Sequence, residues 1–184
     1  AMVPEKPSVG AVAAEVGTPV MASRGRGTRA SGRRDEPGVG DGIRMSPTPH
    51  GVALHVRLAI ENTGDRAFPF GLGWHPFFPK APDTTLAFAA SHVWENDVAQ
   101  IPVRRVAVPP AWRFDAARPL GEVVLDHVFE PSTGAATIAW PSARVAVAIE
   151  ADRALDRRVV YVPVGRDFLA FEPASHMTDA FNRA

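Results

Sequence analysis

From residue 51 onward, apolar and polar side chains alternate along this chain with a period of two. Between Val52 and Glu61 every second residue is a bulky aliphatic, and the residues between them are small, charged or histidine. This period places the apolar side chains on one face of a β-strand and the polar ones on the other. The predicted strands span residues 52–61, 84–90, 98–108 (with a break at Pro102), 123–129, 135–140, 143–151, 158–162 and 167–171.

Turn-forming residues separate these short segments. The chain contains 18 prolines and 15 glycines among its 184 residues, and no helical pattern continues for more than two turns. Short strands at this spacing are typical of an antiparallel sandwich or barrel, and not of alternating strands and helices. We therefore predict an all-β fold.

The first 49 residues differ in composition from the rest of the chain. All fifteen aromatic residues lie from Phe68 onward. A segment of this composition buries too little apolar surface to offset the entropy that ordering costs. We therefore predict that residues 1–49 are disordered or loosely attached, and we place the folded domain at residues 50–184. Ala1 before Met2 has the look of a cloning remnant, and this segment could also be non-native sequence.

Charge and composition exclude several classes of function. Lysine plus arginine and aspartate plus glutamate both number 20, and there is no cysteine, so neither a broad basic field nor a thiolate site is expected. The arginines of residues 22–34 lack the aromatic neighbours that stack on bases, and no apolar run reaches the length of a membrane span. The histidine spacing offers no metal site. We expect no nucleic acid, membrane or metal partner, and a cytoplasmic location.

Residues 68–79 combine five aromatic side chains with three prolines and His75. Because proline cannot donate to a β-ladder, this segment is expected to end a strand or to follow a sheet edge. An imidazole among aromatic side chains suits a sugar-binding cleft, where flat apolar faces meet one polar group. The residues alone leave a core histidine, hydrogen-bonded to the backbone, equally open.

Glu172 follows an apolar strand and precedes Pro173. A carboxylate at the end of such a strand is partly desolvated, which raises its pKa and makes it usable as a base. An exposed glutamate at a strand end is the simpler interpretation of these residues alone. Nearby, Ser175, His176 and Asp179 include the residue types of a hydrolytic triad, but they lie in one loop, which disfavours that arrangement.

Three motifs, in order, resemble the aldose 1-epimerase (galactose mutarotase) family. They are Gly-Trp-His-Pro-Phe-Phe at 73–78, Leu-Asp-His-Val-Phe at 125–129, and Phe-Glu-Pro-Ala-Ser-His-Met-Thr-Asp-Ala-Phe-Asn at 171–182. The resemblance covers about residues 50–184 and corresponds to the C-terminal half of that family. It implies a large antiparallel β-sandwich, the galactose mutarotase-like supersandwich, here truncated on its N-terminal side.

The resemblance also implies roles for single residues. His75 matches the general acid that protonates the ring oxygen of a hexose, and Glu172 matches the general base that deprotonates the anomeric hydroxyl. Asp126 matches a carboxylate that binds sugar hydroxyls, and no cofactor is implied. Separately from the resemblance, Trp94 is the tryptophan that we nominate as a platform for a sugar ring.

Residues 1–49 do not match the N-terminal half of the family, which carries a further sugar-binding histidine. Three hypotheses therefore stand: a mutarotase, a sugar-binding protein without turnover, and a fragment that depends on a partner chain. Half a sandwich leaves sheet edges uncovered, so a homo-oligomer that covers them is expected.

Overall fold

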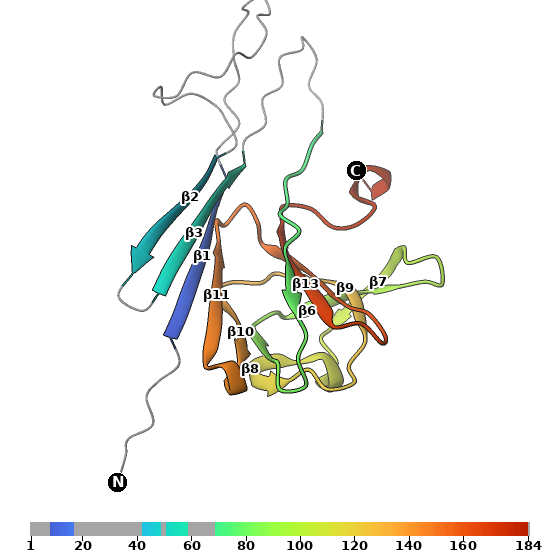
Figure 1. Cartoon of the computed structure of the whole chain (residues 1–184). Helices are drawn as coiled ribbons and strands as arrows, with labels where there is room; N and C mark the ends of the chain where they lie inside the picture. Colours follow the sequence, from blue (N-terminus) through green and yellow to red (C-terminus); the bar gives the residue numbers. More distant parts are fainter. Residues whose placement is uncertain (1–7, 17–41, 49–50, 59–68, 184) are drawn as a thin grey trace, which may run out of the picture.

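The computed structural model describes residues 8–16, 42–48, 51–58 and 69–183. Two β-sheets make up this part of the chain, one with seven strands and one with six. In Figure 1 the blue, teal and orange strands of the first sheet lie beside the second sheet, which carries the red strand near the C-terminus. The predicted all-β sandwich is confirmed.

The seven-stranded sheet has the order β2-β3-β1-β11-β10-β5-β8. In chain order its strands are β1 (Ser8–Val16), β2 (Gly42–Thr48), β3 (Gly51–Leu58), β5 (Thr85–Phe88), β8 (Phe114–Pro119), β10 (Ala136–Trp140) and β11 (Val145–Ala151). β1 pairs in parallel with both β3 and β11, whereas the other pairs of this sheet are antiparallel.

The six-stranded sheet is antiparallel throughout and has the order β4-β13-β12-β9-β6-β7. Its strands are β4 (Phe77–Pro79), β6 (His92–Asn96), β7 (Pro102–Ala107), β9 (Leu125–Glu130), β12 (Arg157–Val162) and β13 (Phe168–Ala174). The described residues form three short 3-10 turns, η1 (Pro110–Trp112), η2 (Pro141–Ala143) and η3 (Ala180–Arg183). None of their helical segments is long and apolar enough to cross a membrane.

Each predicted strand coincides with an observed one, but the segment predicted at residues 98–108 begins late. Asp97 accepts hydrogen bonds from the N–H groups of Ala99 (2.8 Å) and Ile101 (3.0 Å), and Gln100 has a φ of 62°. These contacts form a tight turn, since an aspartate side chain can close a turn on its own backbone. Strand β7 therefore starts at Pro102.

Two stretches of the segment predicted to lack order are strands. Ser8–Val16 pairs with both β3 and β11, and Gly42–Thr48 forms a hairpin with β3. Main-chain hydrogen bonds to neighbouring strands do not require aromatic side chains, and the division of the chain at residue 50 stays a prediction. The other residues of 1–49 lie outside the described part of the chain.

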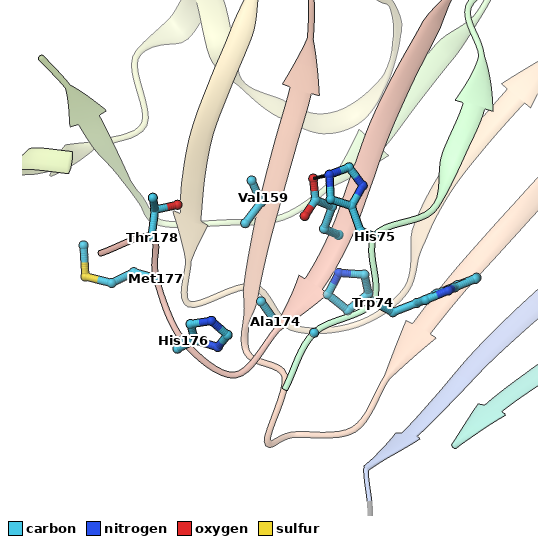
Figure 2. A pocket seen from close by; sticks show the side chains of 10 residues that line it. Trp74, His75, Val159, Ala174, His176, Met177 and Thr178 are labelled. Atoms are coloured by element: carbon cyan, nitrogen blue, oxygen red, sulfur yellow. Dashed lines mark ion pairs between the residues drawn. The ribbon is translucent and has the colours of Figure 1, made fainter. Parts of the chain in front are cut away.

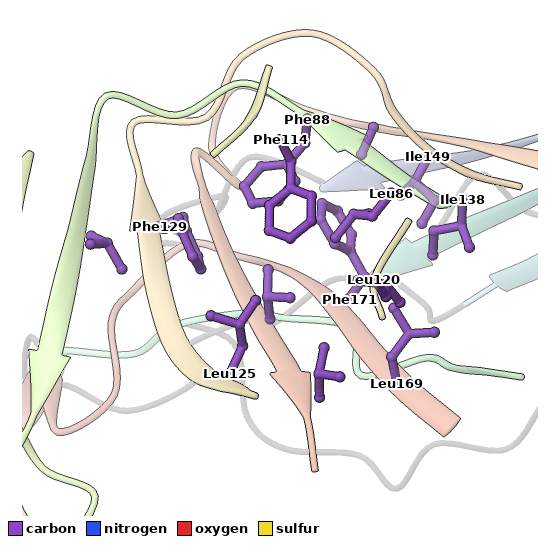
Figure 3. Close-up of a cluster of buried hydrophobic side chains, with 14 of the residues drawn as sticks. Leu86, Phe88, Phe114, Leu120, Leu125, Phe129, Ile138, Ile149, Leu169 and Phe171 are labelled. Atoms are coloured by element: carbon purple, nitrogen blue, oxygen red, sulfur yellow. The ribbon is translucent and has the colours of Figure 1, made fainter. Parts of the chain in front are cut away.

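Apolar side chains from both sheets form one core between them. Figure 3 shows this cluster, in which rings and aliphatic side chains of the two sheets interdigitate. Phe88 of the first sheet contacts Phe129 and Phe171 of the second, with ring centres 5.1 and 5.2 Å apart. The alternation of β13 directs Leu169 and Phe171 into this core, so Ala170 and Glu172 lie on the opposite face of the sheet.

That outer face of the six-stranded sheet carries a row of residues in register. Glu172 of β13 lies opposite Val159 of β12, Val159 opposite Val128 of β9, and Val128 opposite Trp94 of β6. Asp126 lies two residues from Val128, so it projects from the same face. The outer face therefore presents three of the four predicted site residues.

Candidate active site

His75 reaches the outer face through a short antiparallel ladder. Two main-chain hydrogen bonds, of 3.0 and 2.8 Å, tie residues 72–74 to residues 173–175, and a β-bridge lies between the same segments. The chain then follows the sheet edge as β4, as the prolines of this segment predict. The ladder sets His75 opposite Glu172, 97 positions away in the sequence.

The imidazole of His75 and the carboxylate of Glu172 are in direct contact. Nε2 of His75 lies 3.1 Å from Oε1 of Glu172, and Figure 2 marks this pair with a dashed line. The His75 side chain is 55% exposed, whereas that of Glu172 is 15% exposed. The ring of His75 stacks on Phe77, with centres 4.6 Å apart and an angle of 29° between the planes. The contact thus joins an accessible imidazole to a largely buried carboxylate.

Burial raises the pKa of Glu172 above its ordinary value. The positive charge of a protonated His75 opposes this shift, and the negative charge of Asp126 adds to it. The net shift is upward, so the surroundings disfavour the ionised carboxylate. A carboxyl group with a raised pKa accepts a proton more readily than an exposed glutamate does, which is what a general base requires.

A pocket of about 310 Å³ opens beside this pair. Its lining comes from residues 73–75, from Val159, and from residues 172–174 and 176–178. Figure 2 shows Val159 and Ala174 between His75 on one side and His176 and Thr178 on the other. The pocket therefore combines a small apolar floor with polar groups on two sides.

Asp126 lies on the same face but outside the lining of this pocket. It is opposite Tyr161 of β12 in the register, and its main-chain carbonyl accepts a hydrogen bond from the amide of Asn96 (2.6 Å). Burial raises the pKa of Asp126, against the attraction of His127. Its charge acts on Glu172, so the two carboxylates belong to one electrostatic neighbourhood.

Trp94 lies three strands from Glu172 in the row described above, about 14 Å away at the usual strand spacing. It does not line the pocket. The guanidinium of Arg183 lies over its ring, 5.4 Å from the ring centre. Arg183 thus covers one face of the indole. The role of Trp94 in sugar binding stays a prediction.

Three residues of the site region have positions that the sequence did not reveal. Ser175 accepts a hydrogen bond from the N–H of Leu72 (2.8 Å), and His176 packs against Gly71 so closely that a Cβ at position 71 would lie 2.2 Å from its Nδ1. The only sequence signal was the run of Ser, His and Asp after Glu172. Asp179 of that run pairs with Asn182 and Arg183, so these residues form no triad.

The metal-binding potential of the described residues is low. Among them no group of three or more histidine, cysteine, aspartate or glutamate side chains converges in a way that could hold a metal ion.

Comparisons with known proteins point to one family. A family model described as aldose 1-epimerase matches residues 50–184. The uncharacterised protein YphB of Escherichia coli K12 is 30% identical over 155 residues, which cover 76% of this chain and 52% of YphB. A crystal structure from Escherichia coli K12, of a protein provisionally assigned as an aldose 1-epimerase, superposes with a TM-score of 0.59. The two sequences are 28% identical, and the match covers 64% of this chain and 43% of the Escherichia coli chain.

The chain thus spans about half the length of the relatives that it matches. The family model nevertheless covers both residues of the His75–Glu172 contact and the whole six-stranded sheet. The three motifs, the all-β sandwich and the match over residues 50–184 agree with one another. This chain belongs to the aldose 1-epimerase family.

Proposed function

We propose that the pocket beside His75 and Glu172 interconverts the α and β anomers of a hexose. The observation that carries this proposal is the 3.1 Å contact between the imidazole of His75 and the partly desolvated carboxylate of Glu172. Mutarotation needs one group that gives a proton and one that takes a proton, acting at the same time on neighbouring oxygens. A histidine and a glutamate side by side in a pocket meet that requirement.

The proposed reaction begins with the imidazolium of His75 and the ionised carboxylate of Glu172. Glu172 takes the proton of the anomeric hydroxyl, His75 protonates the ring oxygen, and the bond between C1 and the ring oxygen breaks. The product is the open-chain aldehyde, with neutral imidazole and protonated carboxyl group. Rotation about the C1–C2 bond turns the other face of the carbonyl toward the hydroxyl, and ring closure with the two roles reversed gives the other anomer.

The closeness of His75 and Glu172 suits this chemistry. The ring oxygen and the anomeric oxygen are both bonded to C1, so one acid and one base can serve them only from positions a few ångströms apart. A bound sugar would separate the two side chains, and each would then exchange its present partner for a sugar oxygen. The exposed imidazole has the freedom to make that change, and Val159 and Ala174 offer an apolar floor for the C–H groups of the ring.

Asp126 has a supporting place in this proposal. Its negative charge adds to the raised pKa of Glu172, and its carboxylate could accept hydrogen bonds from sugar hydroxyls, as the family resemblance implies. Burial also raises the pKa of Asp126, because its carboxylate is partly removed from water. A hydrogen bond from a sugar hydroxyl would replace part of this lost hydration.

Polarimetry of freshly dissolved α-D-glucose and α-D-galactose tests the proposal. We expect the wild-type chain to accelerate the approach to anomeric equilibrium, and His75→Gln and Glu172→Gln each to lower the enzymatic rate by about 10²- to 10⁴-fold, the usual contribution of one positioned acid or base. His92→Gln and Glu122→Gln are matched controls, since neither residue lines the pocket. Unchanged rates in the His75 and Glu172 variants would overturn the assignment of these roles.

A second candidate is a sugar-binding protein without turnover. The observation that favours it is the coverage of about half of the length of the relatives, because other parts of a cleft can lie in the portion that this chain does not match. Trp74 lines the pocket, so its fluorescence reports binding. A saturable change in fluorescence with hexoses, without faster mutarotation, would decide for this candidate.

A further inference from the structure

His176 forms the side of the pocket that faces the His75–Glu172 pair, and the proposed reaction leaves it without a role. Its ring lines the pocket, and Figure 2 shows it separated from His75 by Val159 and Ala174. A hexose lying over these two small side chains would have its reacting end at His75 and Glu172. Its other hydroxyl groups would then point toward His176.

The position of the His176 ring is fixed by its packing against Gly71. A Cβ built at position 71 would lie 2.2 Å from Nδ1, 2.6 Å from Cγ and 2.8 Å from Cε1 of His176. Real Cβ atoms do not approach other atoms this closely, so any other residue at position 71 would force the ring to move. Glycine at this position therefore makes room for the imidazole.

The hydroxyl of Ser175 contacts one ring nitrogen of His176. Its oxygen accepts a hydrogen bond from the N–H of Leu72 (2.8 Å) and lies 3.4 Å from Nδ1 of His176. Because a hydroxyl has one proton and two lone pairs, it can donate to Nδ1 or accept from it, so either tautomer of the neutral ring satisfies this contact. In both tautomers Nδ1 is next to Ser175, and Nε2 is the ring nitrogen that a ligand can reach.

We propose that His176 is a ligand-binding residue whose Nε2 forms a hydrogen bond with a hydroxyl group of a bound pyranose. The class of ligand rests on the proposed function, whereas the position of the ring does not. Among the described residues no protein group forms a hydrogen bond with this Nε2. The residue acts on binding and not on the proton transfers, which occur on the opposite side of the pocket.

Titration of the full chain with D-glucose and D-galactose, followed by tryptophan fluorescence, measures this contribution. We expect His176→Ala to weaken binding by about three- to tenfold, the usual effect of one hydrogen bond, while the shape of the pH–rate profile stays that of the wild type. His92→Ala is the matched control. His92 also follows a serine whose hydroxyl contacts its Nδ1 (2.8 Å), but it does not line the pocket.

A double-mutant cycle with Gly71 tests whether the imidazole of His176 contacts the ligand or only supports the structure. Gly71→Ala keeps the imidazole but displaces it, so we expect binding to weaken about as much as in His176→Ala. In the double variant the added methyl group meets no ring, because the three nearest atoms to a Cβ at 71 all belong to His176. The double variant should therefore bind as His176→Ala does, which is strong non-additivity.

The outcomes distinguish this inference from the proposed function. Normal binding by His176→Ala, or losses that add in the double variant, would overturn the role of His176 even if the wild type is an active mutarotase. Weaker binding by His176→Ala in a chain that does not accelerate mutarotation would uphold the role of His176 and reject the proposed function. A wild-type chain that binds neither sugar would overturn both.

Discussion

Glu172 sits where its charge is unfavourable. Burial disfavours the ionised carboxylate, and the nearby charge of Asp126 adds to that effect, so the attraction of His75 does not bring the pKa down to its ordinary value. A general base must nevertheless be ionised to act. The ionised carboxylate of Glu172, which the proposed reaction needs, therefore lowers the stability of the folded chain.

We expect Glu172→Gln to stabilise the chain at neutral pH. Because the pKa of Glu172 is higher in the folded state than the usual 4.5, its contribution to stability is complete below pH 4.5 and is lost as the pH rises through the folded-state pKa. The glutamine variant has no such loss. Thermal unfolding should show it melting a few degrees above the wild type at pH 7, with the gap closing toward pH 4.

Glu122→Gln is the control for this measurement, because Glu122 is exposed and its replacement should leave the melting temperature unchanged across the same range. A glutamine variant at 172 that melts below the wild type at pH 7, by a gap that widens with pH, would contradict the expectation. It would mean that the attraction of His75 outweighs the cost of burial.

At the scale of single residues, the sequence indicated the groups but not all of their contacts. The residues alone favoured an exposed glutamate at a strand end, whereas Glu172 lies within β13, which continues to Ala174, and burial raises the pKa of its carboxyl group. The contact between His176 and Gly71 could not be predicted, since 105 positions separate them. In a sequence, a glycine that leaves room for a neighbouring side chain cannot be distinguished from a glycine in a turn until that neighbour is known.

At the scale of elements, the ladder between residues 72–74 and 173–175 determines where His75 lies. Ser175 contributes three contacts to it: its N–H and its hydroxyl each bond to the main chain of Leu72, and its carbonyl accepts a hydrogen bond from Arg157 (3.2 Å). Arg157 in turn pairs with Glu130 (2.9 Å). Ser175 therefore links the segment that carries the imidazole to Arg157 and the interior strands of the sheet, in addition to the main-chain bond between Trp74 and Pro173.

We expect Ser175→Ala to lower kcat for mutarotation by about tenfold. Without the hydroxyl, the N–H of Leu72 loses its acceptor, which costs about 1–3 kcal/mol where the group is kept from water, and His75 three residues later loses its fixed position. Ser175→Thr keeps the hydroxyl and should retain most of the activity. Stopped-flow polarimetry over a range of hexose concentrations separates kcat from KM.

The exposed Ser91 supplies the control for this experiment, because Ser91→Ala removes a hydroxyl that also contacts a histidine. Equal activities of the alanine and threonine variants at position 175 would show that the hydroxyl does not position His75. An unchanged pH–rate profile in Ser175→Ala, with kcat lowered, is the signature of a positioning role.

Three strands within residues 69–183 were not predicted from the sequence. β4, β6 and β8 have three, five and six residues, and β4 and β8 lie at sheet edges. An edge strand has one neighbour and few buried side chains, so the alternation of apolar and polar residues along it is weak. β6 lies inside its sheet, but the apolar residues Val93 and Trp94 are consecutive, which obscures the period of two. The interior strands β12 and β13 were visible, because their apolar residues face one core.

At the scale of the whole molecule, the four sheet edges differ in length. Each edge strand carries a proline near one end, Pro47 in β2, Pro79 in β4, Pro102 in β7 and Pro119 in β8, and proline cannot donate a main-chain hydrogen bond to another chain. β2 has seven residues, whereas β4 has three and β7 and β8 have six each. We therefore expect self-association to use β2, the longest of the edge strands.

We expect a concentration-dependent dimer through this edge. Sedimentation velocity of the full chain should show the dimer fraction rising with protein concentration, and Arg44→Pro, which removes a main-chain donor from β2, should lower it. Asp115→Pro, on the edge strand β8, is the control variant and should leave the dimer fraction unchanged. A single species of monomer mass at all concentrations would contradict the expectation.

One aromatic ring, that of Phe88, contacts rings of both sheets. Phe88 is 5% exposed, and it packs on Phe129 and Phe171 of the opposite sheet and on Phe114 of its own. Since Phe171 directly precedes Glu172, the same contact supports the strand that carries the proposed base. The stability of the sandwich and the position of the site therefore depend on a common cluster.

Phe88→Ala should lower the free energy of unfolding by about 3–5 kcal/mol, because it removes a buried ring and leaves a cavity between the sheets. Phe77→Ala is the matched control: that ring is 60% exposed, so its loss should cost less than about 1 kcal/mol. Urea unfolding followed by circular dichroism measures both. Equal losses for the two variants would mean that the cluster around Phe88 does not hold the sheets together. A large loss in Phe88→Ala alone would establish that the core beneath Glu172 holds the two sheets together.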